Sequence, residues 1–216
     1  MRGDSIVVET HHVKAAKGIS KILLPQVELS MERHSLSIAG ESGSGKSEIA
    51  AALRDEISQN GIRSVILQQD DYFVYPPKTN DQTRRRDIKW VGPGEVRLEM
   101  LDGHIQSFLN GEPQIRKPLV IYSEDRISDE ILELGGVQLI IVEGTYTSLL
   151  DNVMTRVFID RNYLDTEKHR RRRMRDQSEL DLFIEQVLSI EHQIISQHRF
   201  DASIVVNKDY SVTAVS

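Results

Sequence analysis

The chain has 216 residues, of which 39% are hydrophobic and 28% are charged, a composition typical of a single globular domain. It has no cysteine, which excludes disulfides and thiolate metal sites, and its formal net charge of −6 gives no overall field that favours nucleic acid. No segment approaches the roughly 18 apolar residues of a membrane span, and residues 1–8 lack the apolar core of a signal peptide. We therefore expect a cytoplasmic protein with no membrane partner.

The first predicted elements are a helix and an edge strand. Residues 11–24 carry apolar side chains at weak helical spacing, and Pro25 follows as a stop. Residues 27–31 then alternate apolar and polar side chains, as an edge strand does. We expect one domain over the whole chain, 1–216, with residues 1–33 as an N-terminal extension.

A phosphate-binding loop is predicted next. Residues 34–39 form an apolar strand, residues 40–47 fit G-x-x-x-x-G-K-[ST] at every position, and residues 46–59 have a helical pattern. The glycines let backbone N–H groups turn toward a phosphate, and the helix N-terminus adds partial positive charge. A chance Gly/Ser loop is the alternative, and the complete match in this context disfavours it. The predicted nucleotide-binding residues are Gly40, Ser42, Gly43, Ser44, Gly45, Lys46, which reaches the β/γ-phosphates, and Ser47, which holds Mg²⁺.

Two aspartates follow the second predicted strand, residues 62–67. Ligands of open α/β sheets bind beyond the carboxyl ends of the strands, so Asp70 is expected to face the P-loop. Phosphoryl transfer needs a base for the acceptor hydroxyl and a group that fixes Mg²⁺, and Asp70 could do either. The alternative is that Asp70 and Asp71 only open a turn; if Asp70 is structural, Asp71 becomes the candidate base. Residues 74–94 predict a long functional loop.

An acidic residue ends the most apolar strand of the chain. Residues 95–109 predict a helix, and residues 115–121 and 127–134 predict two strands. Residues 137–142 are apolar almost throughout, which is typical of a strand buried on both faces of a parallel sheet. Glu143-Gly144 follow at the place where an acidic residue usually holds Mg²⁺ or its waters. The alternative is that Glu143 caps the next segment.

The last predicted elements complete an α/β fold. Residues 156–159 and 202–206 predict strands, and residues 163–175 and 178–198 predict helices. Strands that alternate with helices indicate a P-loop fold with a mostly parallel sheet and helices on both faces.

Two arginine runs allow more than one interpretation. Five arginines fall within residues 168–176, and on composition alone a solvated basic helix face or a nucleic-acid patch is favoured. The sharper alternative is a lid, over about residues 161–178, in which Arg171 and Arg175 close over a triphosphate. For Arg84–Arg86 we expect solvated loop charges, with a site for an anionic substrate group as the alternative.

In this order, the motifs resemble those of the uridine kinase/phosphoribulokinase family. The resemblance runs from about Leu36 to Val206 and rests on the P-loop, Asp70-Asp71-Tyr72-Phe73, Glu143-Gly144, Arg171-Arg172-Arg173-Met174-Arg175-Asp176 and the Asp201-Ala202 strand. It implies ATP and Mg²⁺ as cofactors and Asp70 as the catalytic aspartate. It also favours the lid interpretation of Arg171 and Arg175.

The acceptor side departs from the family pattern. Uridine kinases carry Phe-Asp-x-Pro, whose Asp grips ribose hydroxyls, and here Trp90-Val91-Gly92-Pro93 puts Val91 in that place. Their Tyr-Asp-Phe-x-x-His-x-Arg stretch is replaced by residues 122–126, without a histidine. Uridine is therefore expected to be a poor acceptor, whereas Arg84–Arg86 and Lys89 would suit a phosphorylated or carboxylated one. The candidate acceptor-pocket residues are Tyr72, Trp90, Arg126 and Tyr146.

The sequence therefore predicts a kinase that uses ATP and Mg²⁺ to phosphorylate a hydroxyl of a nucleoside, sugar or sugar phosphate. Lys46, Asp70, Arg171 and Arg175 are its predicted catalytic residues, and Ser47, Glu143 and Asp70 its metal ligands. The expected partner is the small acceptor, not nucleic acid, because no aromatic residues interleave with the arginines; the chain could form a homo-oligomer.

The rival interpretation is a P-loop GTPase or ATPase of switch or metallochaperone type. Guanine recognition by such proteins needs N-K-x-D, and Asn207-Lys208-Asp209-Tyr210 places the aspartate one position too early. No D-x-x-G element follows the strand that ends at Glu143. Both departures disfavour this rival.

Overall fold

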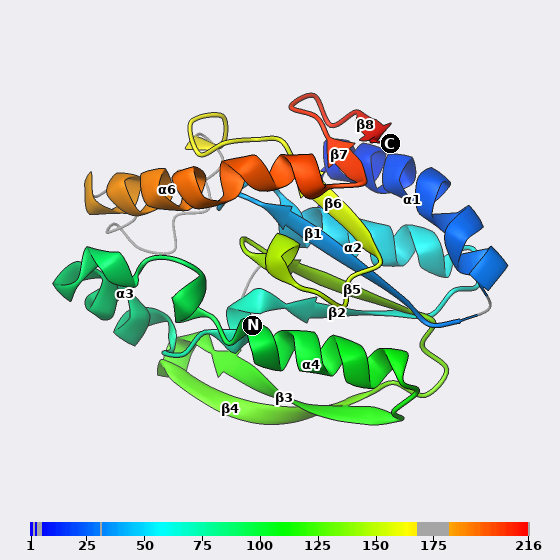
Figure 1. Cartoon of the computed structure of the whole chain (residues 1–216), viewed down its shortest axis with the longest axis horizontal. Helices are drawn as coiled ribbons and strands as arrows, with labels where there is room; N and C mark the ends of the chain where they lie inside the picture. Colours follow the sequence, from blue (N-terminus) through cyan, green and yellow to red (C-terminus); the bar gives the residue numbers. More distant parts are fainter. Residues whose placement is uncertain (2, 4–5, 31, 168–181, 216) are drawn as a thin grey trace.

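The computed structural model describes residues 1, 3, 6–30, 32–167 and 182–215. Within them, a six-stranded sheet has the order β2-β5-β1-β6-β7-β8 (Figure 1). Five strands are parallel, and only the edge strand β8 runs antiparallel to its neighbour. The predicted fold class is confirmed. The strands are β1 (His34–Gly40), β2 (Ser64–Gln68), β5 (Leu139–Gly144), β6 (Thr155–Ile159), β7 (Ile204–Val206) and β8 (Val212–Ala214).

Helices cover both faces of the sheet, and the residues of β5 show why. Leu139 and Ile141 pack into the core under α2 (Lys46–Ser58) and α1 (Thr10–Ser30). Ile140 and Val142 point the other way, into a core with α4 (Leu98–Leu109) and the end of α6 (Leu182–Ile195). Because side chains alternate along a strand, an apolar run such as β5 can supply both cores at once.

The N-terminal helix is longer than expected. α1 runs through Pro25, and the predicted stop at this proline is wrong. The predicted edge strand over residues 27–31 is also wrong, since Val27 and Leu29 lie in α1, whereas Met31 lies outside the described residues. A proline removes one helical hydrogen bond, but Leu23 and Val27 on either side of Pro25 are both buried in the core shared with α2. Packing of this stripe therefore outweighs the local stop signal.

Residues 74–94, between β2 and α4, hold a helix where we expected a loop. α3 spans Pro77–Arg86, and three-residue 3₁₀ helices follow at Ile88–Trp90 and Pro93–Glu95. Pro77 at the first turn suits a helix start. The Asp125 carboxylate accepts hydrogen bonds from the backbone N–H groups of Lys78 (2.6 Å) and Thr79 (3.2 Å). This cap comes from a distant part of the chain, and α3 has no apolar stripe, so the local pattern does not reveal the helix.

A separate hairpin carries that capping residue. β3 (Gln114–Ile121) and β4 (Arg126–Glu133) pair antiparallel as a two-stranded sheet beside α4 (Figure 1). The two strands predicted here are confirmed, and the turn between them contains Asp125 in a left-handed conformation. The turn of the hairpin thus holds the first turn of α3 through Asp125.

The C-terminal elements follow the sequence pattern in part. The helix predicted over residues 178–198 is α6, followed by a 3₁₀ segment at Ser196–Asp201. β7 was expected, whereas β8 was not. Most of the helix predicted over 163–175, with Arg171 and Arg175, lies outside the described residues. Among the residues described, no helix is both long enough and apolar enough to cross a membrane.

Gly18 in α1 tests how this helix packs on β8, and Gly103 in α4 serves as the comparison. A Cβ at Gly18 in α1 would lie 2.6 Å from the Val212 Cγ2 atom, whereas a Cβ at Gly103 in α4 would have no described atom within 4 Å. We expect Gly18→Ala to lower the free energy of unfolding by about 1–3 kcal/mol through overpacking. Gly103→Ala should raise it by about 0.8–1 kcal/mol through helix propensity. Urea unfolding of the two variants measures both values, and stabilisation by Gly18→Ala would contradict the packing of α1 on β8.

Candidate active site

The loop between β1 and α2 has the shape of an anion site. Gly43 and Gly45 have φ angles of 78° and 99°, in the left-handed region that glycine occupies without strain. α2 begins directly after them at Lys46, so its unsatisfied N–H groups and its positive dipole end face the same space as the loop amides. The geometry is the one that the P-loop pattern predicts.

The acidic residue of the loop ties it to the C-terminal part of the chain. The Glu41 carboxylate is buried and lies 2.5 Å from Nδ1 of His192 on α6, and it accepts the Tyr163 N–H at 2.6 Å. The Glu41 carbonyl accepts a hydrogen bond from the Lys46 ammonium at 3.0 Å. Lys46 therefore folds back over its own loop, where bound phosphates would lie.

Oxygen ligands for a cation meet where α2 begins and β5 ends. The Ser47 hydroxyl donates to Oε1 of Glu143 at 3.0 Å, and the Gln68 amide donates to the same oxygen at 3.2 Å. Burial and, to a smaller extent, the charge of Asp70 raise the pKa of Glu143 to about 7, against the opposing effects of Lys46 and of the two hydrogen bonds. A bound dication would favour the ionised carboxylate here.

These residues fit Mg²⁺ and do not form a cage of protein ligands. Among the described residues, no three His, Asp or Glu side chains gather as a complete metal site. Mg²⁺ is usually held by one or two protein oxygens, with water and substrate phosphates completing its octahedron. Ser47 and Glu143 supply such a partial set, and Asp70 lies close enough to affect Glu143.

The two aspartates after β2 have different surroundings. Asp71 is buried and accepts hydrogen bonds from the Lys117 ammonium (2.8 Å) and the Val120 N–H (2.9 Å) of β3. Its carboxylate therefore attaches the hairpin to the sheet. Asp70 is exposed in the turn after β2 and lies close enough to Glu143 to affect its pKa, whereas Asp71 lines the cavity beside Glu143 with its carboxylate already held by the hairpin.

A cavity of about 580 Å³ opens beside the predicted metal ligands Ser47 and Glu143. Ser47, Gln68 and Glu143 form part of its wall, and Lys117 and Leu119 of β3 form another part. The cavity places the hairpin and the predicted metal site around one shared space.

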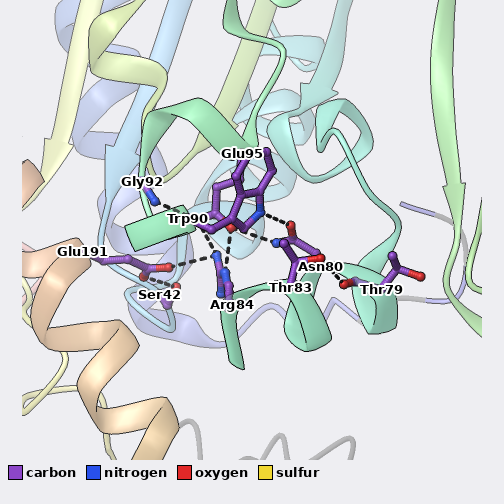
Figure 2. A network of polar contacts seen from close by, with 9 residues as sticks. All are labelled: Ser42, Thr79, Asn80, Thr83, Arg84, Trp90, Gly92, Glu95 and Glu191. Atoms are coloured by element: carbon purple, nitrogen blue, oxygen red, sulfur yellow. Dashed lines mark hydrogen bonds and ion pairs between the residues drawn. The ribbon is translucent and has the colours of Figure 1, made fainter. Parts of the chain in front are cut away.

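Arg84 is at the centre of a polar network that joins α3 and the turn at Glu95 to the P-loop (Figure 2). Its guanidinium makes a two-pronged ion pair with Glu95, at 2.6 and 2.7 Å, and lies 3.5 Å from Glu191 of α6. The Glu191 carboxylate also accepts the hydroxyl hydrogen bond of Ser42 in the P-loop at 3.0 Å. The expectation of a solvated loop charge is therefore wrong for Arg84, because two carboxylates surround it.

Comparison with known proteins agrees with this geometry. The model of the phosphoribulokinase/uridine kinase family matches residues 36–211. The chain belongs to this family. The expectation of a uridine kinase-like small-molecule kinase is thereby confirmed at the level of the family.

Individual relatives differ in name and in length. A uridine kinase of Geobacillus kaustophilus is 29% identical over 75% of this chain and 78% of its own length. A bifunctional alpha-galactosidase/sucrose kinase of Mediterraneibacter gnavus is 29% identical over 82% of this chain, which spans only 20% of that relative. The solved D-glycerate 3-kinase of Cryptococcus neoformans superposes with a TM-score of 0.63 at 14% identity, covering 93% of this chain and 99% of that one. This last likeness concerns the fold alone.

The predicted acceptor residues of this family member are not all in one place. Tyr72 is fully buried, and its hydroxyl pairs with Nδ1 of His104 at 2.8 Å. Arg126 lies on the hairpin, paired with Glu124 at 2.8 Å and largely exposed. Trp90 and Tyr146 do border the Arg84 network. We therefore retain only Trp90 and Tyr146 as acceptor candidates.

Tyr146 approaches the network from the end of β5. Its side chain is buried, and its hydroxyl has no hydrogen-bond partner among the described residues. Burial raises its pKa, and the carboxylates of Glu191 and Glu95 raise it further, while Arg84 acts against them. Tyr146 thus offers a neutral hydroxyl to the network.

The rival guanine motif forms an ordinary turn. The Tyr210 N–H donates to the Asn207 carbonyl at 2.8 Å, and the Asp209 carboxylate accepts from the N–H and hydroxyl of Ser211. Lys208 pairs with Asp165 at 2.8 Å. The turn is thus held by its own contacts, and nothing in it favours the GTPase alternative.

Sequence reasoning missed four residues of the site, and their signals were weak. Glu95 and Glu191 are fully or almost fully buried acids, but in the sequence Glu95 follows the turn residues Gly92-Pro93-Gly94 and Glu191 stands among ordinary helix-forming residues, so neither looks different from a surface acid. Asn80 looks like one more polar residue of α3. Gln69 fills the space over Gly144, where an added Cβ would clash with the Gln69 side chain, and this close approach gives that glycine a structural role.

Proposed function

We propose that the chain transfers the γ-phosphoryl group of ATP to a hydroxyl of a small molecule. The observation that carries this proposal is the Ser47–Glu143 hydrogen bond at the mouth of the P-loop, with exposed Asp70 beside it. A nucleotide-binding loop, a partial magnesium site and a carboxylate base are the parts that phosphoryl transfer needs.

Each group has a role in the proposed reaction. The loop amides and Lys46 hold the phosphates, and Ser47 and Glu143, with help from Asp70, hold the cation. Mg²⁺ bound there would neutralise charge on the transferring phosphoryl group. Asp70 orients the acceptor hydroxyl and takes its proton. Arg171 and Arg175 remain the proposed lid residues, although they lie outside the described part of the chain.

The acceptor that fits best is neutral and rich in hydroxyl groups. Arg84 is already paired with Glu95 and Glu191, and Arg85 is paired with Asp81 at 2.8 Å. The cations that the sequence suggested for an anionic acceptor are thus partly neutralised within the protein. This argues against our expectation of a phosphorylated or carboxylated acceptor.

Two aromatic side chains, Tyr75 and Trp90, come before and after α3 in the sequence and lie close together; α3 is the helix that carries Arg84 and Arg85. Tyr75 is exposed, Trp90 is half-buried, and their ring centroids lie 5.5 Å apart. The Trp90 indole donates to Asn80 Oδ1 at 2.9 Å, which fixes the ring. A fixed aromatic face beside polar groups suits the apolar face and hydroxyl edge of a sugar. The names of the relatives include acceptors of this kind, uridine and sucrose.

Asp70→Asn tests the proposed base. The asparagine keeps the size of the side chain but cannot accept the proton, so turnover should fall by about 10²-fold or more while ATP still binds. Asp71→Asn is the matched control: it should lower the melting temperature, because Asp71 holds Lys117 and Val120 of the hairpin. Steady-state phosphorylation assays and thermal melting give both readouts. Near-normal turnover of Asp70→Asn would remove Asp70 from the mechanism.

The acceptor class is tested by assaying each neutral sugar beside its own phosphate ester, with uridine and cytidine in the same panel. We expect kcat/KM to be about tenfold or more higher for the neutral member of the best pair, because Arg84 and Arg85 are already paired with acids of the protein. Uridine should be poor, since Val91 cannot accept its ribose hydroxyls and each unpaired hydroxyl costs about 1–3 kcal/mol. If the catalytic efficiency with uridine instead lies in the ordinary range of enzymes, about 10⁴ M⁻¹s⁻¹ or above, the chain is a plain uridine kinase.

A further inference from the structure

Four side chains, two buried and two partly buried, connect the P-loop to residues 74–95, which we call the acceptor segment; the four form the Glu191 cluster. They are Ser42 of the P-loop, Glu191 of α6, Arg84 of α3, and Glu95, which ends the 3₁₀ turn after Gly92 (Figure 2). The chain of contacts runs from the Ser42 hydroxyl through Glu191 and Arg84 to Glu95. The acceptor segment is therefore joined to the phosphate-binding loop by a continuous series of polar contacts.

The two carboxylates of the cluster are compensated to different degrees. Glu95 is fully buried and accepts hydrogen bonds at both oxygens, from Arg84 twice, from the Asn80 amide at 2.8 Å and from the Gly92 N–H at 3.0 Å. Within the described part of the chain, Glu191 accepts only the Ser42 hydroxyl and the long Arg84 contact of 3.5 Å. Glu191 is thus the carboxylate whose charge depends most on Arg84.

The position of Glu191 makes that charge matter for the nucleotide. Its carboxylate touches Ser42, which belongs to the loop that wraps the phosphates, and Lys46 is near enough to influence it. Burial raises the pKa of Glu191, while Arg84, Ser42 and Lys46 act against that shift. Without the guanidinium the pKa of Glu191 would rise further, and the fraction of the carboxylate that stays ionised would repel the triphosphate in a poorly solvated place, where charges interact strongly.

We propose that Arg84 is a positioning residue for the nucleotide, acting through Glu191: it screens the Glu191 carboxylate and thereby keeps the Ser42 side of the P-loop favourable to phosphate. Arg84 also holds Glu95 and so fixes the acceptor segment at the same time. The same guanidinium thus couples the acceptor segment to nucleotide affinity. This inference rests on the proposed use of ATP.

A purely structural role for Arg84 makes a different prediction. In that case Arg84 only compensates two buried acids, and removing either acid should relieve the loss of Arg84 to a similar extent. In our proposal only the removal of Glu191 restores nucleotide affinity, since Glu95 has no contact with the P-loop in the described structure. Glu95→Gln and Glu191→Gln remove the same charge, so they form a matched pair.

The experiment measures the binding of a non-hydrolysable ATP analogue with Mg²⁺ by calorimetry, without acceptor. We expect Arg84→Met to raise the dissociation constant about tenfold or more, and Arg84→Met/Glu191→Gln to bring it within about threefold of the unaltered chain. Arg84→Met/Glu95→Gln should stay about tenfold or more weaker. Arg85→Met is the control on the neighbouring arginine, which pairs with Asp81, and should bind normally.

Three results would overturn the proposal: normal binding by Arg84→Met, failure of Glu191→Gln to restore binding, or equal restoration by Glu95→Gln. Should the single Arg84→Met variant not fold, the two double variants still decide, because they carry equal charge and differ only in which acid is neutralised. Melting temperatures of all variants separate affinity from stability. Failure of the unaltered chain to bind the analogue would instead contradict the proposed function itself.

Discussion

The parallel pairing of β1, β5 and β2 is the constraint on which the rest of the site depends. The register sets Glu143 opposite Ile38 on one side and Gln68 on the other. Because parallel strands end at the same edge, the P-loop, the Glu143 carboxylate and the Asp70 turn all emerge there. The Ser47–Glu143 hydrogen bond then joins the start of α2 to the end of β5. A change of register by one residue would move Glu143 away from Ser47 and remove the proposed cation site.

Electrostatic compensation explains the second half of the site. Burying Glu95 and Glu191 without a partner would be costly, and breaking a buried ion pair usually costs about 3–5 kcal/mol. Arg84 compensates both acids, and the Asn80 amide and the Gly92 N–H saturate Glu95. Ion pairs and hydrogen bonds thus hold the acceptor segment at Glu95, and a partly compensated acid, Glu191, contacts the P-loop. Arg84 takes part in both.

Short sequence patterns predicted the elements whose structure depends mainly on neighbouring residues. The P-loop, the strands leading to Asp70 and Glu143, the hairpin and the fold class follow from turn chemistry and periodicity in short windows. Pro25 wrongly predicted the end of α1, because apolar residues before and after this proline pack in the core with α2 and keep the helix intact. α3 was missed because its cap, Asp125, comes from a distant turn. Arg84 was misjudged because its partners lie 11 and 107 residues away in the chain.

The central claim is that the loop between β1 and α2 binds Mg²⁺·ATP through Lys46. The most direct measurement is calorimetric titration of the unaltered chain and of Lys46→Ala with the same ATP analogue, together with thermal melting. A hydrogen bond to a charged group contributes about 1.5–3 kcal/mol, so Lys46→Ala should weaken binding by roughly tenfold or more. Its melting temperature should not change, since the Lys46 ammonium bonds only the Glu41 carbonyl within the described residues. Equal affinity of the two proteins for the analogue would contradict the account.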